Sequence, residues 1–110
     1  MIKGYKIEKL EAIAVFTERM KNFDENTIEC TIHTFFRLSE KQRKVLNCDE
    51  LKRFLLKSIP VKVAIQYNKN YAIWYDYKGQ KLLKMLLSLK PDKIRIVTFT
   101  ILDKSQLPRG

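Results

Sequence analysis

Residues 61–102 have the sequence VKVAIQYNKNYAIWYDYKGQKLLKMLLSLKPDKIRIVTFTIL, in which apolar segments alternate with short polar turns. Val63, Ile65 and Tyr67 alternate with polar or small residues, a pattern typical of a strand with one buried face. Asn, Gly and Pro stand between the apolar segments, where tight turns use them. We predict four strands, at residues 61–67, 71–77, 80–89 and 93–102. Connections this short join antiparallel neighbours, so we expect an antiparallel β-meander.

The last of these strands does not reveal which of its faces is buried. One set of alternate residues is Lys93, Arg95, Val97, Phe99 and Ile101, and the other is Ile94, Ile96, Thr98 and Thr100. If the set with Phe99 is core, Thr98 and Thr100 point to an open face, where a hydroxyl could bind a phosphate or ribose oxygen. Threonine is also common in strands for its β propensity alone.

The N-terminal half has a helical pattern instead. Apolar residues recur every three or four positions from residue 7 to 23, which predicts an amphipathic helix. Residues 27–34 are rich in β-branched side chains and predict a short strand. A helical continuation through Phe35 and Phe36 is the alternative for that segment.

Two further helices are predicted before the meander, at residues 35–46 and 49–56. Asn47, with Glu50 three residues later, matches a capping box that would begin the second helix. The expected fold class is therefore α+β, with N-terminal helices packed on a four-stranded antiparallel meander. The sheet has five strands if residues 27–34 join it.

The length of the chain, 110 residues, predicts a single domain with one hydrophobic core. Within residues 1–110 we expect an N-terminal helix at 1–26, an α+β core at 27–103 and a polar tail at 104–110. Apolar residues are 45% of the chain and charged residues 31%, which is a globular composition.

Cys30 and Cys48 are the only cysteines, and neither a Cys-x-x-Cys spacing nor a second histidine accompanies them. We therefore expect reduced thiols, no metal site and no cofactor. No apolar run reaches the roughly 18 residues of a membrane span, and the first residues lead into an acidic segment rather than a signal-peptide core. These features predict a cytoplasmic protein that does not contact a membrane.

The positive charge of the chain is concentrated in its second half. Residues 1–50 hold nine basic and nine acidic side chains, whereas residues 51–110 hold thirteen basic and three acidic ones, and the net charge is +10. Such a field attracts nucleic acid, because binding releases counterions condensed on the phosphates. A role in solubility is the alternative explanation.

His33, the only histidine, falls where the predicted short strand meets the next helix. An imidazole can take a proton from a ribose 2′-hydroxyl, or donate one to a leaving oxygen, near neutral pH. Arg37 lies one helical turn beyond it, followed by Lys41, Arg43 and Lys44, and guanidinium groups there could hold a scissile phosphate. An ordinary histidine beside a solvated charged helix face is the alternative.

Aromatic and basic residues are interleaved on the middle hairpins. Trp74 and Tyr75 lie between Lys69 and Lys78, and Arg95 lies on the last strand. Exposed aromatic rings beside cations can stack on bases, which contributes about 1 to 3 kcal/mol per base. We predict that these five residues, together with Lys41 and Lys44, contact nucleic acid, although core packing accounts for some aromatic residues whatever the function.

A strand ending in His33, a helix bearing Arg37 and Arg43, a second helix and a meander ending in Ile96-Val97-Thr98-Phe99-Thr100 follow one another in this chain. The segment from about residue 27 to 103 thereby resembles small ribonuclease toxins of the RelE and BrnT kind, in the barnase, EndoU, colicin and RelE fold group. The resemblance implies a metal-independent endoribonuclease that leaves a 2′,3′-cyclic phosphate and a 5′-hydroxyl.

The same resemblance implies roles for individual residues. His33 is the expected general base or acid, Arg37 and Arg43 the phosphate clamp, and Thr98 a hydrogen-bonding partner. A second proton-transfer group would be Lys41 or Tyr75. The family also implies an acidic antitoxin protein that covers the basic face.

Two other functions remain open at this point. One is a non-catalytic nucleic-acid-binding or regulatory module, acting on RNA or DNA. The other is a protein-interaction subunit whose basic sheet binds an acidic partner. The ribonuclease hypothesis requires His33, whereas these two do not.

Overall fold

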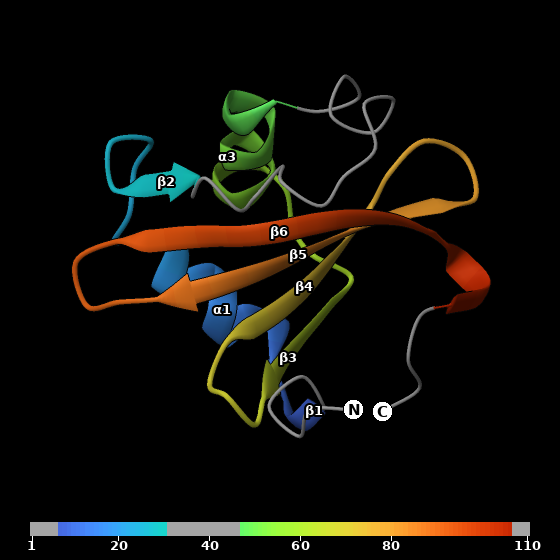
Figure 1. The fold of residues 1–110 in the computed structure, drawn as a ribbon, viewed down its shortest axis with the longest axis horizontal. Coiled ribbons are helices and arrows are strands. Elements are labelled where there is room, and N and C mark those ends of the chain that lie inside the picture. Colours follow the sequence, from blue (N-terminus) through green and yellow to red (C-terminus); the bar gives the residue numbers. More distant parts are fainter. Residues whose placement is uncertain (1–6, 31–46, 107–110) are drawn as a thin grey trace.

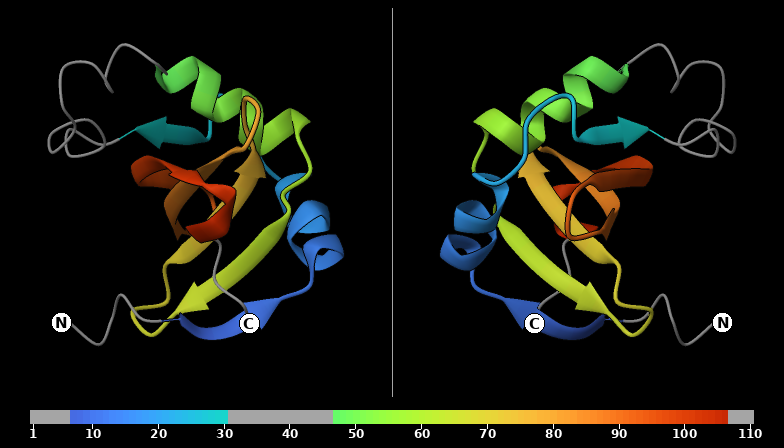
Figure 2. Two further views of the ribbon diagram at one scale, coloured as in Figure 1. Left: turned by 90° about the vertical axis from the view of Figure 1, so that its right-hand side faces the viewer. Right: turned by 90° about the vertical axis from the view of Figure 1, so that its left-hand side faces the viewer.

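The computed structural model describes residues 7–30 and 47–106, and this part contains a six-stranded mixed sheet with two α-helices on one of its faces (Figures 1 and 2). In chain order the elements are β1 (Ile7–Glu11), α1 (Ile13–Met20), β2 (Ile28–Cys30), α3 (Cys48–Lys57), β3 (Lys62–Gln66), β4 (Tyr71–Asp76), β5 (Lys81–Leu89), β6 (Ile94–Asp103) and the 3-10 turn η2 (Lys104–Gln106). The helix predicted at residues 35–46 lies outside the described residues.

The four predicted strands of the meander are present as β3, β4, β5 and β6. They are neighbours in sequential order, and each pairs antiparallel with the next. Lys69 and Gly79 have positive φ angles of 71° and 60°, in the turns that follow β3 and β4. These turns are short, so each strand folds back beside the one before it.

The predicted architecture is wrong at both edges of the sheet. Residues 7–11, expected to be the start of a helix, form β1 and pair antiparallel with β3, so α1 begins only at Ile13. At the other edge, β2 pairs parallel with β6, which makes the sheet mixed, in the order β1-β3-β4-β5-β6-β2. The edge of β3 supplies hydrogen-bond partners for the backbone N–H and C=O groups of residues 7–11. This long-range pairing outweighs the helical spacing of their apolar side chains.

A bulge in β6 determines which of its side chains face the core. Two consecutive residues of β5 lie opposite Ile96 and Thr98, so Val97 has no partner in the ladder. One extra residue shifts the alternation by one position, and Ile96 and Phe99 therefore share the buried face. Strict alternation in the sequence could not assign this face, because the core residues change from one predicted set to the other at Val97.

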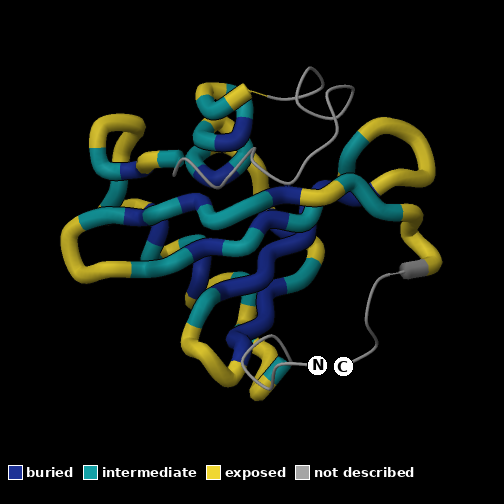
Figure 3. Tube along the Cα trace, viewed as in Figure 1, coloured by how far each residue is buried: buried dark blue, intermediate teal, exposed yellow. Residues whose placement is uncertain are grey.

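The main core lies between the sheet and the two helices. Phe16 and Met20 of α1, and Leu51 and Leu55 of α3, are four residues apart in each helix and therefore lie on one helical face. Figure 3 shows the buried positions concentrated along the central strands, with exposed positions at the turns. A smaller buried cluster on the other face of the sheet consists of Ala64, Ala72, Trp74 and Leu82.

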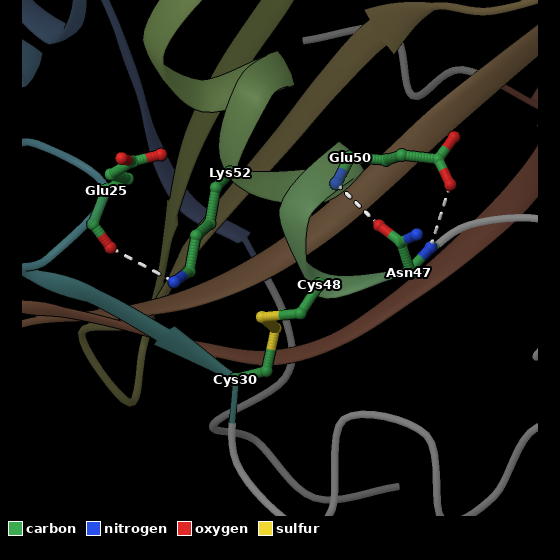
Figure 4. The surroundings of a disulfide bond; sticks show 6 residues. All are labelled: Glu25, Cys30, Asn47, Cys48, Glu50 and Lys52. Atoms are coloured by element: carbon green, nitrogen blue, oxygen red, sulfur yellow. Dashed lines mark hydrogen bonds between the residues drawn. A yellow bond between two sulfur atoms is a disulfide. The ribbon is translucent and has the colours of Figure 1, made fainter.

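Cys30 and Cys48 form a disulfide, so the reduced state predicted for them is wrong (Figure 4). Cys30 is the last residue of β2 and Cys48 the first of α3, and their Cα atoms are 6.1 Å apart. This separation lies within the range that a disulfide spans. Their spacing of 18 residues carries no recognisable motif, because the bond depends on the packing of α3 beside β2.

The capping box predicted at the start of α3 is confirmed. The Asn47 side-chain oxygen accepts a hydrogen bond from the Glu50 amide at 2.9 Å, and the Glu50 carboxylate accepts one from the Asn47 amide at 3.3 Å (Figure 4). One turn along the helix, Lys52 Nζ donates to the carbonyl oxygen of Glu25 at 3.0 Å. These bonds hold the N-terminus of α3 where its first residue meets Cys30.

Candidate nucleic-acid interface

The predicted catalytic group lies mostly outside the described residues. Five predicted site residues lie outside the described residues, namely His33, Arg37, Lys41, Arg43 and Lys44. Thr98 is half-buried on β6, opposite Leu86, on the face of the sheet away from α1 and α3. The roles expected of His33 and Thr98 therefore stay predictions.

The rings of Trp74 and Tyr75 are buried on opposite faces of β4. Trp74 is 0% exposed, and Lys84 Nζ lies 5.4 Å from its ring centroid. Tyr75 is 1% exposed and packs against Phe54, with 5.6 Å between ring centroids. Buried rings offer no face to a base, which corrects their assignment as nucleic-acid contacts. Burial also raises the pKa of Tyr75, which disfavours it as the second proton-transfer group.

The three predicted cations within the described ranges do not form one patch. Lys69 lies in the turn after β3, with its Nζ 2.8 Å from Oε2 of Glu8. Arg95 Nε donates a hydrogen bond to Oε1 of Glu29 at 3.0 Å. Lys78 lies in the turn after β4, at the opposite end of that strand from Lys69. Only Lys69 lies beside a basic pocket.

That pocket, of about 540 Å³, lies beside the C-terminal end of α1 and two turns of the sheet, and is called the cationic pocket below. Alternate turns of a meander fall at the same end of the sheet, so the β3–β4 and β5–β6 turns meet there. Four basic residues from four separate segments line it, namely Lys9, Arg19, Lys69 and Lys90. Its apolar wall consists of Phe23, Ile65, Leu89 and Pro91.

Arg19 is oriented by two residues of the sheet. Its Nη1 donates a hydrogen bond to the Tyr71 hydroxyl, and its Nη2 lies 3.6 Å from Oε1 of Glu11. The guanidinium stands over the Tyr71 ring, with Cζ 5.6 Å from the centroid, and the Tyr71 hydroxyl donates to the same Glu11 oxygen at 3.4 Å. A guanidinium has five N–H donors, so Arg19 retains donors for a ligand after these contacts.

The electrostatics of the cationic pocket favour an anion. Lys9 and Lys90 are exposed and form no salt bridge with any residue in ranges 7–30 and 47–106. Burial, followed by the nearby Glu11 carboxylate, raises the pKa of Tyr71, so its hydroxyl stays protonated near neutral pH. The hydrogen bond from Lys69 lowers the pKa of Glu8, which keeps that ion pair charged.

Sequence reasoning missed three of the four cations in this pocket. Lys69 and Lys90 fall in the first and third turns of the predicted meander, and this placement was a usable signal that they share one end of the sheet. Lys9 and Arg19 had no such signal. They reach the pocket because β1 joins the sheet beside β3, a pairing that the local sequence does not encode.

Comparison of the chain with known protein families, with curated proteins and with solved structures finds no match. The resemblance to the ribonuclease toxins therefore stays a prediction. Neither α1 nor any other helix within the described ranges has the length and apolar character needed to cross a bilayer. In the same ranges, no three His, Cys, Asp or Glu side chains are grouped so that they could hold a metal ion.

Proposed function

We propose that this chain is an RNA-directed protein that binds the RNA backbone at the cationic pocket. The observation that carries the proposal is the convergence of Lys9, Arg19, Lys69 and Lys90 from four segments of the chain. Within the described residues, these four cations outnumber Glu8 and Glu11, the two carboxylates that form salt bridges with them. The net charge of +10 adds a longer-range attraction for a polyanion.

Binding of this kind has a characteristic salt dependence. Each phosphate neutralised on a single strand releases condensed counterions and contributes about −0.7 to the slope of log K against log salt concentration. Four phosphate contacts at the pocket therefore predict a slope of about −3. A gel-shift titration of single-stranded RNA at several salt concentrations measures this slope, with single-stranded DNA of the same sequence as comparison.

The catalytic part of the proposal is a metal-independent endoribonuclease, as the resemblance implies. His33 removes the proton from a ribose 2′-hydroxyl, whose oxygen bonds to the adjacent phosphorus while the bond to the 5′-oxygen breaks. The leaving 5′-oxygen takes up a proton from Lys41, the second predicted proton-transfer group, which gives a 2′,3′-cyclic phosphate and a 5′-hydroxyl. Arg37 and Arg43 stabilise the charge on the phosphate oxygens, and Thr98 donates a hydrogen bond to one of them.

Cleavage of labelled RNA in EDTA, by the purified chain and by a His33→Ala variant, tests this step. Cyclic-phosphate ends that disappear in the variant are the expected result. Intact RNA from both proteins, together with a salt-sensitive gel shift, would leave a non-catalytic nucleic-acid-binding module. Failure to bind RNA or DNA at low salt would overturn the whole proposal and favour a protein-interaction subunit.

An acidic antitoxin protein is the partner that the proposal includes, because its carboxylates would compete with RNA for the same cations. The compartment enters the proposal through the disulfide. Such bonds are rare in the cytoplasm outside hyperthermophiles and common in oxidising compartments. If the protein is cytoplasmic, as predicted from the sequence, the Cys30–Cys48 disulfide has to persist in a reducing compartment. Thiol trapping at cell lysis measures the fraction of the protein that carries the bond.

A further inference from the structure

We infer that the cationic pocket is a subsite for one nucleotide, with the phosphate at its basic residues and the base against its apolar wall. The inference rests on the proposed function, because it names the part of an RNA chain that this pocket takes. The chemical class of the ligand is a nucleoside monophosphate, either as a unit of RNA or free.

The basic residues are suited to a phosphate group. Lys9 and Lys90 lie on different segments, are exposed and form no salt bridge within the described ranges, so a bound phosphate displaces no partner from them. Arg19 is held by Tyr71 and Glu11 before any ligand arrives. A guanidinium fixed in this way loses little conformational entropy on binding and presents a planar set of donors to phosphate oxygens.

The apolar lining of the pocket is suited to a base. Phe23, Ile65, Leu89 and Pro91 line the pocket, and an inorganic phosphate would leave this apolar surface uncovered. A flat heterocycle can cover it, and the Phe23 ring is half-buried at this wall. Asn22, which also lines the pocket, carries an amide with donors and an acceptor that can bind the edge of a base.

The size of the pocket agrees with a ligand larger than phosphate. Its volume of about 540 Å³ falls within the roughly 300 to 1,000 Å³ of small-molecule sites, most of which combine an apolar lining with a few polar groups. A charged patch that served only for solubility would need neither the apolar wall nor the fixed arginine. The combination therefore favours a nucleotide over a bare anion.

The first experiment compares four probes by titration calorimetry at low salt: uridine 5′-monophosphate, adenosine 5′-monophosphate, uridine and inorganic phosphate. Both monophosphates should bind at least about tenfold more tightly than uridine or phosphate alone, because only they contact both the basic residues and the apolar residues of the pocket. Equal affinity for inorganic phosphate would overturn the inference, since the base would then contribute nothing. A short poly-glutamate peptide serves as a fifth probe, and tighter binding of this peptide than of either monophosphate would also overturn the inference.

Matched variants locate the binding. Lys9→Gln and Lys90→Gln each remove one exposed cation from the pocket and should weaken uridine monophosphate binding about fivefold to tenfold. Lys57→Gln removes an exposed cation from the end of α3, outside the pocket, and should leave the affinity within about twofold. An equal loss in all three variants would show that overall charge, not the pocket, binds the nucleotide.

The same proteins titrated with single-stranded RNA separate this inference from the proposed function. RNA binding without monophosphate binding would overturn the nucleotide subsite and leave the RNA-directed function standing. Absence of binding to either ligand at low salt would overturn both. The expected result is that Lys90→Gln weakens both ligands, while Lys57→Gln weakens neither by more than about twofold.

Discussion

The two outer strands, β1 and β2, both lie in the N-terminal half and flank the meander. Each pairs with a meander strand and carries an ion pair, but β2 is also tied by a covalent bond. β2 has three residues and is tied to α3 by the Cys30–Cys48 disulfide. β1 has five residues and is held by ladder pairing, by the contact of Glu11 with Arg19, and by the Glu8–Lys69 pair. The disulfide offers no charged group that could bind a ligand, whereas the charged residues at β1 border the cationic pocket.

The difference shows how one sheet can separate stability from binding. A disulfide stabilises the fold whether or not a ligand is present, because it restricts the unfolded chain. Charged groups at a surface contribute little stability each, but those that keep free donors can bind an anion. We therefore expect changes at β2 to alter stability and changes at β1 to alter both stability and binding.

The largest effect should come from removing the disulfide that ties β2 to α3. A Cys30→Ser, Cys48→Ser double variant should lose about 3 kcal/mol of unfolding free energy, since the bond closes a loop of roughly 20 residues. Urea unfolding with and without dithiothreitol measures this, and the double variant should not respond to the reductant. Unchanged stability would show that β2 holds its place without the bond, and nucleotide binding should persist in the folded variant.

A smaller loss of unfolding free energy should follow from removing the charged contact between Glu11 of β1 and Arg19. Glu11→Gln should cost about 1 to 2 kcal/mol, because it removes the charge that faces Arg19, which is itself partly exposed to solvent. A double-mutant cycle with Arg19→Gln, followed by urea unfolding, isolates the coupling between the two side chains. Additive losses would contradict the contact, and Glu25→Gln, at an exposed carboxylate that forms no salt bridge within the described residues, is the matched control with no expected change.

The capping box beside the disulfide should contribute less again. Asn47→Ala should lower the unfolding free energy by about 1 kcal/mol, because the Glu50 amide loses its acceptor at the start of α3. Asn47→Asp keeps an acceptor there and should retain most of that stability. If both variants unfold at the wild-type urea concentration, the cap does not help to hold α3 beside β2.

The smallest effect should come from the exposed ion pairs of the two edges. The hydrogen bond from Arg95 lowers the pKa of Glu29 below 4.5, and that from Lys69 lowers the pKa of Glu8 below the same value. Each pair therefore stabilises the fold above pH 4.5 and loses its contribution as the pH falls through the lowered pKa. Thermal unfolding of Glu29→Gln and Glu8→Gln beside wild type should differ at pH 7 and converge in acid. A difference that persists at pH 2 would contradict the mechanism.

The candidate site was only partly predictable for a physical reason. Lys69 was identified from its place between strands rich in aromatic residues. Lys90 could have been placed near it, because alternate turns of a meander lie at the same end of the sheet. Trp74 and Tyr75 were predicted to be exposed contacts, but both rings are buried. Alternation places one ring on each face of the sheet, and the sequence does not show that both faces are covered. Arg19 acquired its place from contacts with Glu11 and Tyr71, which are distant from each other along the chain.

Local patterns in the sequence by themselves determined the four central strands, their order, their turns and the capping box of α3, because these depend on neighbours a few residues apart. Only the tertiary structure decided that residues 7–11 are a strand, that β2 runs parallel to β6, and that Cys30 meets Cys48. Each of these joins segments far apart in the chain, and their pairing energy becomes available only once the meander supplies an edge or a surface.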